Sequence, residues 1–109
     1  MDEDELKQRT RQFALRVIRL TEALPHSPAG EVIGRQLLRS ATSVGANYRA
    51  ACRGRSRADF VNKIGVVEEE ADESHYWLEL IVEVEGNIGS GGPLLDLSTS
   101  NGSIKVLKN

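Results

Sequence analysis

Apolar residues recur at intervals of three and four along most of the first 85 positions of the chain. This spacing gathers them on one side of a helix, which is typical of an amphipathic helix that buries one face. The pattern predicts three helices, over residues 4–24, from 28 to 52 or 53, and from 56 to 84 or 85. We therefore expect an all-α fold, an up-and-down antiparallel helical bundle.

Each predicted helix carries its own apolar stripe. The first stripe consists of Leu6, Phe13, Val17, Leu20 and Leu24. The second consists of Ile33, Leu37, Ala41, Val44, Tyr48 and Ala51. The third consists of Phe60, Ile64, Val67, Ala71, Leu78 and Ile81. Phe13, Phe60 and Trp77 stand at stripe spacing, so we expect them in the core and not on a surface where bases could stack.

Residues with strong local preferences mark the helix boundaries. Ser27 is suited to cap the second helix, with Pro28 at its first position. Gly54 is suited to end that helix. Ser56, with Asp59 three residues later, resembles a capping box in which Asp replaces Glu.

The chain changes character near Gly86. Residues 87–109 are rich in Gly and Ser, and Asn101-Gly102 between two short apolar runs is a hairpin signal. This tail forms either a two-stranded hairpin or irregular, disordered chain. The sequence thus predicts a helical bundle domain over 1–86 with three helices, and a Gly-rich tail over 87–109 where a fourth helix would stand.

Composition narrows the function. Only 5% of the 109 residues are aromatic, so an aliphatic core is expected, and chains of this size often gain stability by oligomerising. The single cysteine, Cys52, is in keeping with a reducing cytoplasm. No apolar run approaches the ~20 residues of a membrane span, so we expect a cytoplasmic protein with no membrane role.

Charge is divided along the chain. Residues 1–57 contain 11 basic and 6 acidic side chains, and residues 58–109 contain 3 and 10. Basic groups favour nucleic acid as a partner. The candidate phosphate-binding residues are Arg35, Arg39, Arg49, Arg53, Arg55 and Arg57. The alternative is that these arginines form ion pairs, either within a helix or with the acidic stretch of the third helix in another subunit. That acidic stretch is the candidate oligomer interface, and it consists of Glu68, Glu69, Glu70, Asp72 and Glu73.

Catalytic patterns are weak. Asp72 and His75 have the spacing of one carboxylate–imidazole pair, but a di-metal bundle needs such a pair on two helices. Cys52 has no histidine nearby in sequence to act as a base. The sequence therefore predicts no metal, no cofactor and no enzyme, and a bundle enzyme that uses a metal is a remote third alternative.

Four segments carry a resemblance that covers residues 12–85: 34–43 (GRQLLRSATS), 47–51 (NYRAA), 55–60 (RSRADF) and 67–74 (VEEEADES). Together they resemble the four-helix-bundle proteins encoded in intervening sequences of bacterial 23S rRNA genes, a family that includes the accessory protein of diversity-generating retroelements. The resemblance implies a homopentameric ring, nucleic-acid binding through basic surfaces, and a reverse transcriptase as a partner. It also implies a fourth helix, often ending in basic residues, in place of the Gly-rich tail.

The function expected from the sequence is that of a non-enzymatic oligomeric helical-bundle protein that binds RNA or DNA through its basic surface. The alternative is a protein–protein interaction scaffold with no nucleic-acid role.

Overall fold

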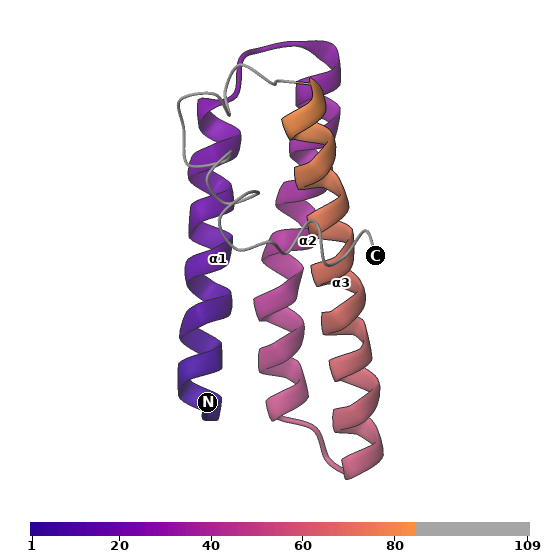
Figure 1. Ribbon diagram of the computed structural model, residues 1–109. Coiled ribbons are helices and arrows are strands. Elements are labelled where there is room, and N and C mark those ends of the chain that lie inside the picture. The colour runs from indigo at the N-terminus through magenta and orange to yellow at the C-terminus, as the bar shows by residue number, and fades with distance from the viewer. Residues whose placement is uncertain (85–109) are drawn as a thin grey trace.

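The computed structural model describes residues 1–84, which form three helices: α1 (Glu3–Ala23), α2 (Pro28–Cys52) and α3 (Arg57–Val84). The helices run alternately up and down, so that α2 is antiparallel to both of its neighbours (Figure 1). The predicted all-α architecture is confirmed, with helix boundaries close to those expected. The tail over 87–109, its predicted hairpin and the position of a fourth helix lie outside the described residues.

The starts of α1 and α2 are fixed by side chains that accept hydrogen bonds from free backbone N–H groups. Asp2 Oδ1 accepts from the Glu5 N–H at 2.8 Å. Ser27 Oγ accepts from the Gly30 N–H at 3.0 Å, with a proline at the first position of α2. Such caps satisfy donors that have no partner within the helix. The cap predicted at Ser27 is therefore confirmed.

The start of α3 differs in one detail from the capping box expected there. Ser56 Oγ accepts from the Asp59 N–H at 3.1 Å, as predicted. The Asp59 carboxylate, however, accepts from the Arg55 N–H at 3.2 Å and from Lys63 Nζ at 2.7 Å. Asp59 therefore ties the preceding turn to the helix, and does not return to Ser56.

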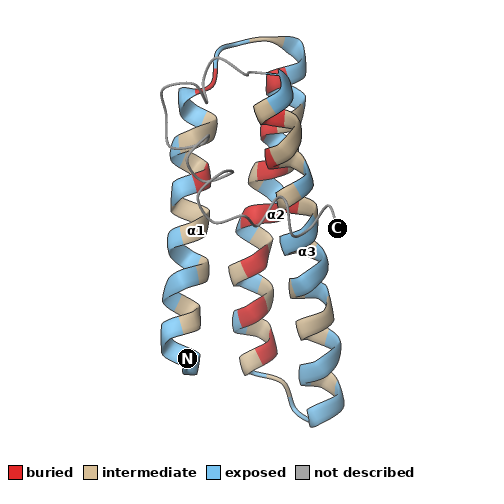
Figure 2. Ribbon diagram, in the orientation of Figure 1, coloured by how far each residue is buried: buried red, intermediate tan, exposed pale blue. Residues whose placement is uncertain are grey.

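Helix α2 forms the centre of the fold, because it packs against both α1 and α3, which lie on its two sides (Figure 1). Two neighbours cover more of a helix than one, and most buried positions are accordingly in α2 (Figure 2). The predicted stripe of α2 is buried apart from Ile33, which is half-buried. The buried hydrophobic residues are Val17, Leu24, Leu37, Ala41, Val44, Tyr48, Ala51, Leu78 and Ile81.

The predicted stripe of α3 is only partly correct. Its buried residues, Ser74, Leu78 and Ile81, all lie in the second half of the helix. Phe60 is 41% exposed, so its expected core position is wrong. Ala71 is also exposed, and Ile64 is half-buried. The physical reason is that α3 has extensive contact with α2 alone, and a single neighbour covers one side of a helix.

Two glycines of α2 face the segment of α1 and its C-terminal cap, and one of them, Gly45, is needed for the close approach. A Cβ atom at Gly45 would lie 3.2 Å from Thr10 Oγ1, closer than an ordinary van der Waals contact. A Cβ atom at Gly34 would lie 3.7 Å from Leu24 Cδ1. Gly45 therefore lets the two backbones come together at a place where alanine would press on Thr10.

Candidate functional site

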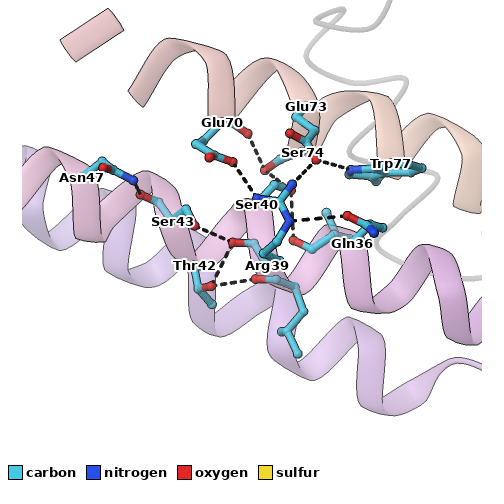
Figure 3. A network of polar contacts seen from close by, with 12 residues as sticks. Gln36, Arg39, Ser40, Thr42, Ser43, Asn47, Glu70, Glu73, Ser74 and Trp77 are labelled. Atoms are coloured by element: carbon cyan, nitrogen blue, oxygen red, sulfur yellow. Dashed lines mark hydrogen bonds and ion pairs between the residues drawn. The ribbon is translucent and has the colours of Figure 1, made fainter. Parts of the chain in front are cut away.

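A cluster of polar side chains joins α2 to α3 around Arg39 (Figure 3). Arg39 forms an ion pair with Glu73, and its Nη1 lies 3.3 Å from Glu70 Oε1. Trp77 Nε1 donates to Glu73 Oε2 at 3.0 Å. The guanidinium of Arg39 is therefore engaged within the chain, and Glu73 accepts hydrogen bonds from two sides.

The electrostatics of this cluster follow from those contacts. The hydrogen bond from Trp77, followed by the one from Arg39, holds the pKa of Glu73 below its usual value. The hydrogen bond to Glu73 raises the pKa of Arg39. Both effects favour the charged forms, so the pair stays ionised at neutral pH.

The remaining candidate arginines have no carboxylate partner among residues 1–84 and are all exposed. They are Arg35, Arg49, Arg53, Arg55 and Arg57. Arg53 caps the C-terminus of α2, and Arg55 lies in the turn before α3. The structure thus gathers three guanidinium groups at one end of the bundle, while Arg35 lies far along α2 from them. The acidic N-terminus of α1 lies at that same end (Figure 1).

The acidic run of α3 divides into two groups. Glu70 and Glu73 bind Arg39 of the same chain. Glu68, Glu69 and Asp72 are exposed, and no ion pair to them exists within the described part of the chain. The sequence suggested pairing within one helix or between subunits, whereas the structure shows pairing between two helices of one chain.

The structure gives His75 a different carboxylate neighbour from the one that the sequence spacing suggested. No group of three or more potential ligands gathers among residues 1–84. His75 Nδ1 lies 3.9 Å from Glu79 Oε1, so its near carboxylate is not Asp72. His75 Nε2 is buried without a hydrogen-bond partner in the same region.

Cys52 is half-buried beside Tyr48. A hydrogen bond with Cys52, together with burial, raises the pKa of Tyr48 to about 12. The phenol is thus neutral over the whole physiological range. Cys52 therefore contributes to packing at the end of α2, in contact with the buried Tyr48.

Sequence reasoning missed one buried polar contact. Ser40 and Ser74 are almost fully buried, and their hydroxyl oxygens are 2.9 Å apart across the α2–α3 interface. Each hydroxyl also lies within hydrogen-bond distance of a backbone carbonyl in its own helix, at Leu37 or Glu70. The available signal was the phase of each serine, three or four residues from a buried apolar position.

A solved structure resembles this chain in both sequence and fold. No curated protein matches the chain. Four chains of solved structures match. One is the crystal structure, at 1.70 Å resolution, of a protein with unknown function from the S23 ribosomal protein family of Bacteroides thetaiotaomicron VPI-5482. It is 41% identical over 78% of this chain and 76% of its own, with a TM-score of 0.71.

A family match covers the described helices in full. Residues 2–86 match the family described as 23S rRNA-intervening sequence protein. The match and the solved relative agree with the resemblance noted in the sequence, and neither indicates an enzymatic family. Within residues 1–84, no helix combines the length and the apolar character that crossing a membrane requires. The chain belongs to the 23S rRNA-intervening sequence protein family.

Proposed function

We propose that this chain is a non-enzymatic, self-associating helical scaffold that contacts RNA or DNA through the turn between α2 and α3. The observation that carries the proposal is the state of Arg53, Arg55 and Arg57. All three are exposed, and none forms an ion pair with a carboxylate in the described chain. We name these three residues the arginine turn.

Unpaired arginines are suited to phosphate contact. Each Lys or Arg that neutralises a phosphate releases condensed counterions, and this gain in free energy does not depend on base sequence. Arg39 differs, since its charge is already balanced by Glu70 and Glu73. A reverse transcriptase, implied by resemblance, would be a further partner on the same scaffold.

Self-association is the second part of the proposal, with a homopentamer as the favoured assembly. A chain of 109 residues has a small core, and assembly adds buried area. Helices α1 and α3 each pack mainly on α2, so each keeps a side free of other described helices. Light scattering at micromolar concentration tests this part, and a monomer mass would refute it.

Salt-titrated binding tests nucleic-acid contact. We expect the parent protein to bind RNA or DNA at ~50 mM salt, and the triple variant Arg53→Ala/Arg55→Ala/Arg57→Ala to bind all sequences more weakly. The slope of log affinity against log salt should flatten by up to about 0.9 for each duplex phosphate that the variant no longer neutralises. Arg39→Ala is the matched control, and it should leave that slope unchanged. A parent protein that does not bind at low salt refutes nucleic-acid contact.

The second candidate function is a protein–protein scaffold with no nucleic-acid role. Two observations favour it. The acidic N-terminus of α1 lies at the same end as the arginine turn, where it would repel phosphate (Figure 1). Large apolar side chains, including Phe60 and Val61, are exposed near the start of α3. Under this candidate the triple variant changes protein partners or assembly, and no salt-sensitive RNA binding exists in the parent.

A further inference from the structure

The two outer helices of the bundle carry opposite charge. Between Leu6 and Thr21, α1 has five basic side chains and no acidic one. Between Glu68 and Glu83, α3 has seven carboxylates and no Lys or Arg. Because α2 lies between them, α1 and α3 are on opposite sides of the molecule (Figure 1). Their outward charges therefore face away from each other within one chain.

The outward side of α1 is identified by its phase. Val17 is buried and belongs to the hydrophobic core shared by the three helices. Two residues along a helix turn the side chain through about 200°, so Leu15 and Arg19 lie on the side opposite Val17. Arg11 is one turn before Leu15 and continues the same row. We name Arg11, Leu15 and Arg19 the basic row. Its two arginines are exposed and have no ion pair within residues 1–84.

The outward side of α3 follows from the same argument. Ser74 and Leu78 are buried, so Tyr76, midway between them, points the opposite way and is 51% exposed. Asp72 and Glu69 precede Tyr76 by four and seven residues and lie on its side. We name Glu69, Asp72 and Tyr76 the acidic row. Its two carboxylates are exposed, with no ion pair in the described chain.

The two rows stand at the same height in the bundle. Gly45 of α2 faces Thr10, and Ser40 of α2 contacts Ser74. Since α2 is antiparallel to α1, moving along α2 from Gly45 to Ser40 corresponds to moving along α1 from Thr10 to Leu15. Leu15 is therefore level with Ser74, and the basic row is level with the acidic row.

We infer that copies of this chain assemble side by side, with the basic row of one copy against the acidic row of the next. A sideways displacement, with no change of height, brings Arg11 to Glu69 and Asp72, and sets Arg19 near the level of Tyr76. The aromatic ring of Tyr76 is available for a cation–π contact with a guanidinium of the next copy. An edge contact with Trp77, at 5.0 Å between ring centroids, helps to hold the Tyr76 ring in place. Leu15 adds an apolar contact.

The contact is heterologous, because different surfaces of the two copies meet. Such a contact closes into a ring when its rotation permits, and otherwise grows without limit. The inference rests on the proposed self-association and specifies its interface. It assigns the unpaired carboxylates Glu69 and Asp72 to a second copy, whereas Glu70 and Glu73 serve Arg39 within the chain.

Charge reversal tests the interface. We expect Arg11→Glu/Arg19→Glu and Glu69→Arg/Asp72→Arg each to weaken assembly at least roughly 10-fold, because like charges would then face each other. The quadruple variant that combines them should regain the parent mass, with its charges exchanged. Arg35→Glu/Arg49→Glu, an equal change on the exposed side of α2, should leave the mass unchanged. Circular dichroism confirms that each variant is helical.

The outcomes separate the interface from the proposed function. A monomeric parent refutes both. An oligomeric parent whose mass survives both double variants refutes the interface alone, as does a quadruple variant that stays dissociated. Should a reversed variant not fold, a cysteine pair gives the answer. Leu15→Cys/Asp72→Cys in a Cys52→Ser background should form disulfide-linked multimers under mild oxidation, and only monomers would overturn the inference.

Discussion

Replacing Leu37 by alanine should destabilise this protein more than replacing Ile64, although the two changes remove similar volume. Leu37 is fully buried, at 0% exposure, in the core that all three helices share. Its replacement removes both transfer free energy and close packing, at about 2–5 kcal/mol for a buried leucine. Ile64 is half-buried on the first half of α3, where no residue is buried, so its replacement should cost clearly less.

Thermal unfolding at a fixed protein concentration measures the difference. For a domain of this size each kcal/mol shifts Tm by roughly 4–8 °C, so Leu37→Ala should lower Tm by about 8–40 °C. Concentration is held constant because assembly also contributes to apparent stability. An Ile64→Ala protein that melts as low as Leu37→Ala would refute our reasoning, since it would mean that the first half of α3 is buried in the assembled protein.

Four further predictions concern single features. Gly45→Ala should destabilise the protein, because the new Cβ would press on the Thr10 hydroxyl, which already lies within hydrogen-bond distance of two backbone carbonyls. Gly65→Ala has open space around it and should stabilise the protein by up to about 1 kcal/mol, as measured by urea titration. Ser40→Ala and Ser74→Ala should each cost about 0.5–1.5 kcal/mol and combine less than additively, and full additivity in a double-mutant cycle would contradict their contact. Arg39→Ala should lower Tm at pH 7. Because the pKa of Glu73 is lowered in the folded state, this stabilisation is present above the ordinary value of 4.5 and is lost as pH falls below it, so parent and variant should converge in acid. The raised pKa of Tyr48 means that stability falls as pH rises from about 10 towards 12, and ultraviolet titration of Cys52→Ala should show Tyr48 ionising at lower pH than in the parent.

The sequence predicted those parts of the fold that depend on local chemistry. Helix boundaries followed from caps such as Ser27 and from the apolar spacing of α2, whose stripe is buried almost throughout. The error at Phe60 has a different origin. Periodicity shows which side of a helix is apolar, but it does not show how many neighbours cover that side. Because α3 packs mainly on α2, Phe60 and Ala71 of its stripe stay exposed.

The candidate site was less predictable. Arg39 has carboxylate partners and the arginine turn has none. This difference depends on which residues of α3 stand level with each turn of α2. The separation of Glu70 and Glu73 from Glu69 and Asp72 likewise reflects helix rotation, which places the first two towards Arg39. Neither property follows from counting charges along the chain. Both properties depend on the height and the rotation of α3 relative to α2.

The central position of α2 also bears on how the molecule opens. Helices α2 and α3 are consecutive in the chain and share the larger interface, so together they form a local hairpin that needs only a short loop to close. Helix α1 has the smaller interface with α2, so its separation breaks fewer contacts than the separation of α3 would, although it exposes the core that Val17 helps to fill. Native-state hydrogen exchange should therefore find α1 in a less protected unit than the paired segments of α2 and α3. A bundle built on a middle helix can thus release one outer helix at a time, and its refolding is completed when α1 returns.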